Sequence, residues 1–403
     1  MSQYHADEVE EMEDEYDMNE PDDDMVEEEE EVYHEPLERD DEDEDEDQLH
    51  KLTDTTLADV RSGKDIQGIP WEKMAITRET YRQARLEQYK NYENIPNSGE
   101  EAMAACKSTE KGEAYYEFRQ NTRSVKSSIS HFQLRNLVWA TTKHDVYLLL
   151  HYSVLHWSAV SGVDTEIMDV HGHVAPTEKH PGSLLEGFCH TQISTMAVKD
   201  NFLVAGGFQG ELICKHLDRK GISFCCRTTF DENAITNALE IFNTTSGALH
   251  FIASNNDCGV REYDMERYQM CKHFRFDWPV NHTSLSPDGK LVVIVGDDTD
   301  ALLIDSNSGK TVYSMKGHLD YSFASAWSPD GRTFATEAAD FVHIFDVKSD
   351  YNKRQELDFF GEVSGMSFSP DTDALYVGVS DRTYGSLLQF GRLYNHSYLD
   401  SLL

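Results

Sequence analysis

Short apolar runs separated by tight polar turns repeat along the C-terminal three quarters of this chain. The clearest copy covers 316–346, where apolar runs predict strands ending at Trp327, over 333–337 and over 342–345. Between the first two strands stands a Ser-Pro-Asp-Gly turn, in which proline presets φ and glycine accepts a positive φ. One such unit cannot bury both faces of its small sheet, so the pattern predicts further copies packed against it.

The Ser-Pro-Asp-Gly turn of 328–331 recurs at 286–289 and, without its glycine, at 369–371. The spacing of about 40 residues is typical of WD repeats, which form β-propellers. Weaker copies lie near 143–145, 199–201 and 245–247. The sequence therefore predicts an all-β fold, a WD-repeat β-propeller in which six blades can be counted and a seventh is possible.

The propeller is expected to cover 113–403 and to close on itself. A strand over 114–120 has no hairpin partner nearby, so we expect it to pair with 386–394 as the outer strand of the last blade. The pattern ends the second blade near His216 and begins the fourth at Tyr268.

Charge separates the first 50 residues from the rest. They hold 27 acidic residues and one basic residue, out of 74 and 35 in the whole chain. Such a segment cannot bury enough apolar surface to fold, so a disordered acidic tail is expected over 1–50. The tail either keeps the protein soluble or attracts a basic partner, and it disfavours nucleic acid as a ligand.

Residues 51–101 are balanced in charge and rich in tyrosine and arginine. Gly68 and Pro70 predict an extended first part, and Thr77 predicts the N-cap of a helix over 77–92. One face of that helix carries four aromatic and basic residues: Tyr81, Arg82, Arg85 and Tyr89. A helix this short must dock, either on the propeller or on a partner protein. A linker is expected over 102–112.

The run GKDIQGIPWEKMAITRETYRQARLEQYKNYENIP, residues 63–96, resembles a short segment shared by a group of fungal and plant WD-repeat proteins. Those proteins also have an acidic leader and a C-terminal propeller. The resemblance implies the same architecture here and no particular biochemical activity.

One polar constellation is consistent with the repeat, and its role is structural. In blade 5, Asp340 is predicted to accept a hydrogen bond from His318, with Thr336 or, less well placed, Ser325 as the strand hydroxyl. Asp257 and Asp298 are predicted to take the part of Asp340 in blades 3 and 4. In blade 4, Asn281-His282 replaces the usual Gly-His.

No pattern indicates catalysis or a cofactor. No nucleophile stands beside a base at a recognisable spacing, and His171, His173 and His180 lack further ligands at metal spacing. We therefore expect no enzyme activity, no metal and no cofactor.

The sequence also carries weak signals about location. Seven cysteines without a CxxC motif indicate a reduced compartment, and no apolar run reaches the roughly 20 residues that span a bilayer. The start of the chain lacks the basic and apolar regions of a signal peptide. Cytoplasm, nucleus or both are expected, without membrane attachment.

These observations favour a non-catalytic scaffold or adaptor that binds proteins through its loops, as a monomeric propeller within a complex. Two alternatives remain. One is an escort chaperone for a basic protein, of the histone or ribosomal type, that uses the acidic tail. The other is an enzyme with a site in the central channel, for which shifted pKa values around the channel would be evidence.

Overall fold

The computed structural model describes residues of the propeller and of the segment that precedes it. The described residues are 53–89, 110–112, 114–129, 136–286, 288–298, 301–315, 325–330, 332–338, 341–346, 348 and 353–394. The chain divides into two units, Met1–Lys51 and Leu52–Leu403, and every described residue belongs to the second. The tail predicted over 1–50 lies outside the described residues.

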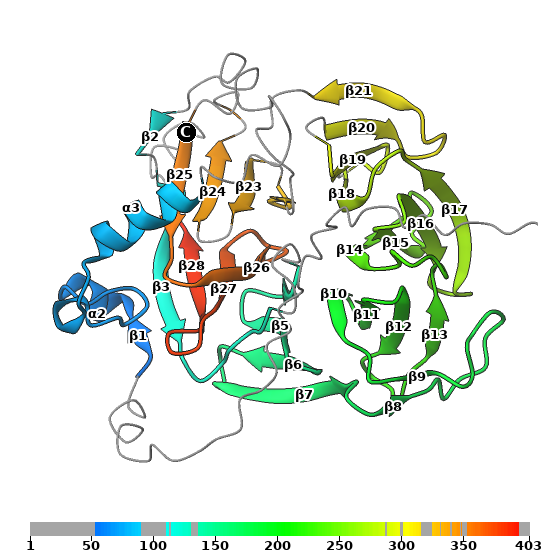
Figure 1. Ribbon diagram of the computed structural model, residues 1–403, viewed down its shortest axis with the longest axis horizontal. Coiled ribbons are helices and arrows are strands. Elements are labelled where there is room, and N and C mark those ends of the chain that lie inside the picture. Colours follow the sequence, from blue (N-terminus) through cyan, green and yellow to red (C-terminus); the bar gives the residue numbers. More distant parts are fainter. Residues whose placement is uncertain are drawn as a thin grey trace, which may run out of the picture. The chain divides into compact units, whose positions relative to one another are not determined.

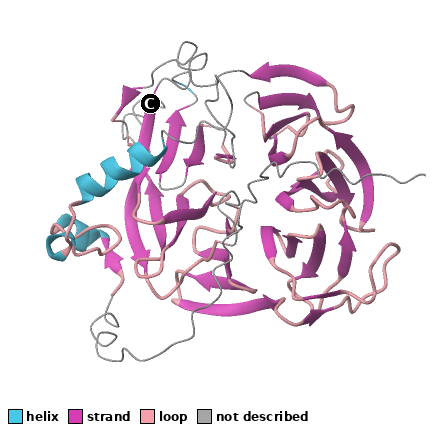
Figure 2. Ribbon diagram, in the orientation of Figure 1, coloured by secondary structure: helices cyan, strands magenta, loops and turns pink. Residues whose placement is uncertain are grey.

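Six antiparallel sheets surround a common centre in the second unit (Figures 1 and 2). Blades 1 and 2 are β4 to β7 and β10 to β13: Val138–Ala140, Asp145–Leu150, Ser153–Ser158, Val163–Asp169; Ile193–Lys199, Phe202–Gly207, Glu211–His216, Phe224–Arg227. Blades 3 and 4 are β14 to β17 and β18 to β21: Thr236–Asn243, Leu249–Asn255, Gly259–Asp264, Gln269–Arg275; Val280–Leu285, Leu291–Gly296, Ala301–Asp305, Thr311–Met315. Blades 5 and 6 contain β22 to β25 and β26 to β28: Ser325–Trp327, Thr333–Ala338, Phe341–Asp346, Lys353–Asp358; Glu362–Phe368, Ala374–Ser380, Ser386–Arg392.

The predicted fold class, an all-β WD-repeat propeller, is confirmed. The described part of the chain holds six blades, the number counted from the repeats. A further two-stranded sheet, β8 (His173–Val174) with β9 (Phe188–Cys189), lies in the long loop between blades 1 and 2.

Blade 6 takes its fourth strand from before blade 1. This strand, β3 (Tyr116–Thr122), pairs antiparallel with β28, so that Arg392 stands opposite Tyr116 and Leu387 opposite Thr122. The strand expected over 114–120 thus begins and ends two residues later, beside the segment proposed as its partner. The pairing joins the two ends of the propeller and leaves neither strand as an open edge.

In blades 2 and 3 the outer strand comes after the residue at which the sequence pattern ended the blade. The pattern ends blade 2 near His216, but β13 pairs with β12 and belongs to that blade. Tyr268 likewise precedes β17, which is the outer strand of blade 3 and not the first strand of blade 4. These two boundaries are wrong because a short turn pairs each outer strand with the strand just before it.

Apolar side chains pack between neighbouring blades. Along β11, Leu203 and Ala205 belong to the core between blades 1 and 2, whereas Val204 belongs to the core between blades 2 and 3. Successive side chains of a strand point to opposite faces, and both faces of this sheet are covered. Inner strands therefore read as continuous apolar runs.

Serine side chains close the first turn of blades 4, 5 and 6. Ser286, Ser328 and Ser369 each accept a hydrogen bond from the main-chain N–H five residues later, at 3.0, 3.0 and 2.9 Å. Each hydroxyl also donates to the aspartate two residues later. The recurring Ser-Pro-Asp motif thus has a local structural cause.

The segment before the propeller extends the sheets of blades 5 and 6. Strand β1 (Thr55–Thr56) pairs with β3, and β2 (Glu110–Lys111) pairs parallel with β25. The second pairing shows that the predicted linker over 102–112 contains a strand. A fifth strand in each blade covers an outer edge that would otherwise be open.

The described residues of this segment include three helices: α2 (Leu57–Arg61), the 3-10 helix η1 (Trp71–Lys73) and α3 (Arg78–Tyr89). The first turn of α3 is capped as predicted, with the Thr80 N–H donating to Thr77 Oγ1 at 3.1 Å. Residues 90–92 of the predicted helix lie outside the described residues. None of the helices in the described part of the chain is both long and apolar enough to cross a membrane.

The prediction of an extended first part misses α2. A capping box begins this helix, in which the Asp59 N–H donates to Thr56 Oγ1 at 3.3 Å and the Thr56 N–H donates to Asp59 Oδ2 at 3.0 Å. The Thr-x-x-Asp sequence at 56–59 is typical of such a helix start. The prediction of an extended segment rested on Gly68 and Pro70 and did not use it.

Candidate partner-binding site at the channel mouth

Helix α3 docks on the propeller of its own chain. The Tyr81 ring stacks on Phe360 with centroids 4.4 Å apart, and Arg82 forms an ion pair with Glu356. The Arg85 and Tyr89 side chains lie outside the described residues. The first half of the predicted docking face is therefore occupied by the propeller.

Gln67 anchors the segment before this helix. Its side-chain amide donates to the Phe360 carbonyl at 2.9 Å and accepts from the Phe360 N–H at 2.7 Å. Arg123 donates to the Gln67 carbonyl at 2.8 Å, and Gln67 is fully buried. We call residues 53–82 the clasp, because they join strand β3 of blade 6 to residues 356–360 at the end of blade 5.

Only part of the predicted hydrogen-bond network of the blades lies among the described residues. His318 and Asp340 lie outside the described residues, as do the side chains of Thr336 and Ser325. Asp257 is described, and it binds Arg261 instead of a histidine.

In blade 3, Asp257 accepts from two nitrogens of Arg261, at 3.0 and 2.5 Å, and from the Gly259 N–H at 3.0 Å. Burial alone would raise the pKa of Asp257, but the bonds from Arg261 outweigh it and lower the pKa. The buried carboxylate fixes the turn between β15 and β16, so its role is structural.

In blade 4, the hydrogen bond falls on the neighbour of the predicted aspartate. Asn281 donates to Asp297 Oδ1 at 2.9 Å, and Asp298 follows in the same turn. Burial raises the pKa of Asp297, and the bond from Asn281 opposes that rise.

The three histidines considered as metal ligands have other partners. His173 Nε2 lies 2.6 Å from the Glu186 carbonyl, and His180 Nε2 lies 3.1 Å from Glu178. His171 packs edge-on against Tyr152. Across the residues that the structure describes, no group of three or more His, Cys, Asp or Glu could hold a metal ion.

A cavity of about 990 Å³ lies at the end of the channel where the first strand of each blade ends. We call it the channel mouth. All six blades contribute to its wall, with one representative residue from each, in blade order: Trp139, Lys199, Glu240, Ser284, Pro329 and Met366. In this set the residues of blades 5, 6 and 1 are apolar and those of blades 2, 3 and 4 are polar.

Glu240 occupies a position at which most blades have a small residue. In blades 2, 3, 4 and 6 the first strand has a register shift near its start, and counting the same number of residues from that shift identifies the position in each blade. The Ser-Pro-Asp turn locates it in blade 5, and the inter-blade hydrogen bond locates it in blade 1. In blade order the residues are Trp139, Ala197, Glu240, Ser284, Ala326 and Ser367.

The same inter-blade hydrogen bond is made by a serine elsewhere. In blade 6, Ser367 Oγ accepts from the Ala140 N–H of blade 1 at 3.0 Å. In blade 3, Glu240 Oε2 accepts from the Leu285 N–H of blade 4 at 2.9 Å. Because a hydroxyl suffices for this contact, the carboxyl of Glu240 is not required by the blade joint.

Two titratable groups of the channel mouth have strongly shifted pKa values. Burial raises the pKa of Glu240 to about 7, opposed by the Leu285 N–H and by the Lys199 ammonium. Burial lowers the pKa of His282 to about 4. At neutral pH the carboxyl is thus partly protonated and the imidazole is neutral.

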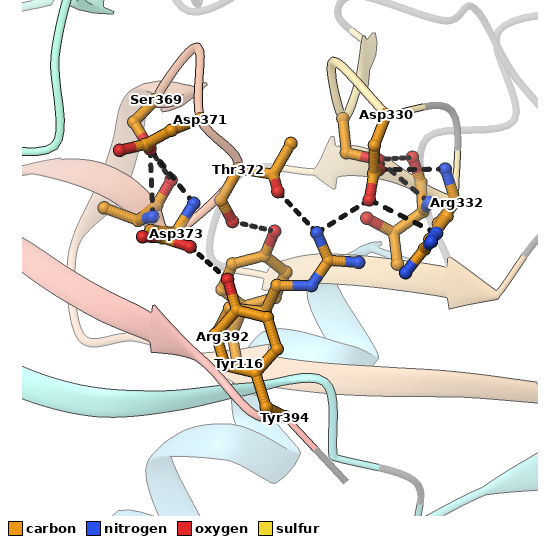
Figure 3. Close-up of polar contacts among 12 residues, drawn as sticks. Tyr116, Asp330, Arg332, Ser369, Asp371, Thr372, Asp373, Arg392 and Tyr394 are labelled. Carbon is orange, nitrogen blue, oxygen red and sulfur yellow. Dashed lines mark hydrogen bonds and ion pairs between the residues drawn. The ribbon is translucent and has the colours of Figure 1, made fainter. Parts of the chain in front are cut away.

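A polar network on the same face ties blade 5 to blade 6 beside the ring closure (Figure 3). Arg392 donates to Asp330 Oδ2 at 2.7 Å and to Thr372 Oγ1 at 2.5 Å. The Tyr116 hydroxyl donates to the Thr372 carbonyl at 3.0 Å. Thr372 has a φ of 64°, where blade 4 has Gly289, so this network holds a β-branched residue in the left-handed region.

Sequence reasoning named the central channel as the place for an enzyme site but did not single out Glu240. Aligning the six repeats on their first turns would have placed this glutamate beside alanines and serines. That comparison is available from the sequence, whereas the burial of Glu240 and the cavity around it depend on the assembled ring.

Comparisons with known proteins agree with the fold. No family model matches the chain. It is 27% identical over 132 residues to cross-pathway control WD-repeat protein 2 of Flammulina velutipes, covering 30% of this chain and 42% of the relative. It is 28% identical over 134 residues to eukaryotic translation initiation factor 3 subunit I of Anopheles gambiae, covering 30% and 41%. The chain thus spans about two fifths of the length of these relatives.

A chain in the crystal structure of the mitotic checkpoint complex superposes with a TM-score of 0.52 at 14% identity. The match covers 72% of this chain and 98% of that one. At this identity the likeness concerns the fold alone.

Proposed function

We propose that this WD-repeat β-propeller is a non-catalytic scaffold that receives a segment of a partner protein in its channel mouth. The observation that carries the proposal is a cavity of about 990 Å³ whose wall draws on all six blades. A closed ring presents such a wall in fixed geometry, and its loops can vary without disturbing the core. One relative is named as a subunit of a translation initiation factor, which supports a role inside a protein complex.

The shifted pKa values in the channel mouth raise the enzyme alternative, but among the described residues no nucleophile is hydrogen-bonded to either group. The hydrogen bond to Glu240 comes from a main-chain amide, and burial alone accounts for the pKa of His282. Within the described ranges, no hydrogen bond joins either group to a serine, threonine or cysteine hydroxyl or thiol. General acid–base catalysis requires such a geometry first and a tuned pKa second. We therefore assign these groups to binding.

Proximity labelling of the full-length protein tests the proposal with one variant at the mouth and one control. Trp139→Leu keeps an apolar side chain but removes the indole from the wall. Phe230→Ser changes a residue that is 88% exposed in the loop between β13 and β14, which leads into the start of an inner strand at the other end of the channel. Thermal melting of both variants controls for folding.

We expect Trp139→Leu to lose neighbours that Phe230→Ser keeps. If both variants keep every neighbour, the channel mouth is not the binding site. If the wild-type protein labels no protein above background, the scaffold role itself is refuted.

The escort role remains a prediction from the sequence, since the acidic tail lies outside the described residues. The same holds for the resemblance to fungal and plant WD-repeat proteins through residues 63–96, and for a location in the cytoplasm or nucleus.

A further inference from the structure

We infer that Glu240 is the acceptor for a lysine or arginine side chain, which a basic segment of the partner protein inserts into the channel mouth. The inference rests on the proposed function, because it names the chemistry that the channel mouth selects. It begins from the odd placement of one carboxyl in a ring of small residues.

The carboxyl of Glu240 has no structural need at its position. Four of the six equivalent positions hold alanine or serine, and a serine makes the same inter-blade bond. Glu240 is only partly exposed, and withdrawing a carboxylate from water is costly unless a cation is bonded to it. Here the bond comes from the uncharged Leu285 amide. A bound cation would offset the cost of withdrawing the Glu240 carboxylate from water, so the site favours a cationic ligand.

The surroundings provide a place for the stem of a long basic side chain. Trp139 and Glu240 are the two large residues of the ring, and blade 2, with its small Ala197 at this position, lies between them. Both large residues line the same cavity, together with Met366. An apolar stem can pack against the indole and the thioether while its charged end reaches the carboxyl.

The other charged groups that line the cavity are paired, hydrogen-bonded within a turn or neutral, with one exception. Asp305, at the end of β20, accepts from the hydroxyl and the N–H of Ser308 at 2.7 and 2.8 Å. On β16, Glu262 is paired with Lys272 of β17 at 2.9 Å, and in the turn after β18 Asp288 is paired with Lys290 at 3.3 Å. His282 of β18 is uncharged at neutral pH, because its pKa is about 4.

The exception is Lys199 of β10, which acts on Glu240 through space and without a hydrogen bond. Its ammonium opposes a cationic ligand and would favour an anionic one. Residues 51–403, without the acidic tail, carry a net charge of −13 (−39 + 26), which favours a basic partner instead. Lys199 therefore provides the decisive test of the sign of the ligand.

The experiment titrates the full-length protein, labelled with ¹³C at its methionine methyl groups, with four blocked pentapeptides. The peptides differ only at the central residue, which is lysine, arginine, glutamine or glutamate. The Met366 signal is assigned by Met366→Leu and reports on the channel mouth. We expect the lysine and arginine peptides to shift it, and the other two to leave it unchanged.

Three further measurements sharpen the result. Between pH 6 and pH 8 the affinity should rise about tenfold, as the ionised fraction of Glu240 grows. Glu240→Gln keeps the acceptor for Leu285 but should abolish both the shift and its pH dependence. Lys199→Gln should tighten binding at pH 8.5, where Glu240 is ionised with or without Lys199.

A shift caused by the glutamate peptide, weakened by Lys199→Gln, would mean that the site binds anions and would overturn the inference. Equal shifts with all four peptides, or none with any, would overturn it as well. If Trp139→Leu still loses partners in the labelling experiment, the scaffold proposal stands even when the peptides fail.

Discussion

Glu240→Gln should make the protein more stable at pH 8 and leave its stability nearly unchanged near pH 4.5. The carboxyl has a pKa of about 7 in the folded protein, against its ordinary value of 4.5. Between these two values folding takes up a proton, so the free energy of unfolding falls as pH rises. The variant cannot ionise and escapes this loss.

The size of the effect follows from the shift. A displacement from 4.5 to about 7 corresponds to roughly 3 kcal/mol between the protonation states, once both folded and unfolded carboxyls are ionised. Glutamine is nearly isosteric, and its Oε1 can still accept from the Leu285 N–H. Other costs of the substitution should therefore be small, and about 2–3 kcal/mol of stabilisation should appear above pH 7.5.

Urea unfolding followed by tryptophan fluorescence at pH 5, 6, 7 and 8 measures the difference between the variant and the wild type. Glu262→Gln is the matched control, because Glu262 bonds to His250 at 2.7 Å and to Lys272 at 2.9 Å. Its loss should destabilise the protein. A Glu240→Gln difference that does not change with pH, or that decreases as pH rises, would refute the reasoning.

Three other predictions follow. Thr372→Asn keeps an acceptor for Arg392 and tolerates a φ of 64°, whereas Thr372→Val keeps the backbone strain and loses the acceptor. Thermal melting should therefore show a higher Tm for the asparagine variant and a lower Tm for the valine variant than for the wild type. Equal Tm values would contradict this explanation. Gln67→Ala leaves both main-chain polar groups of Phe360 unpaired, so hydrogen exchange should rise across the clasp. Exposed Lys73→Ala is the control, and unchanged exchange in the Gln67 variant would show that Gln67 is not the anchor. Deleting 1–50 should remove salt-sensitive partners from a pulldown if the tail escorts a basic protein, and retention of the same partners would exclude that role.

Local patterns were enough to predict the repeating units. The apolar strands and the Ser-Pro-Asp turns depend on contacts within about 40 residues. In the structure, the hydroxyls of Ser286, Ser328 and Ser369 close those turns. The closing strand was also predictable, since an apolar strand without a local partner needs a distant one. These features are local in sequence or required by the need to cover sheet edges.

Only the tertiary structure decided how the conspicuous residues are used. From the sequence, Tyr81 and Arg82 could dock on the propeller or on a partner protein. In the structure they contact Phe360 and Glu356, which lie far along the chain. Sequence reasoning assigned no role to Glu240. Its raised pKa arises because blade 4 covers it, and no short-range pattern can report burial that comes from the neighbouring blade.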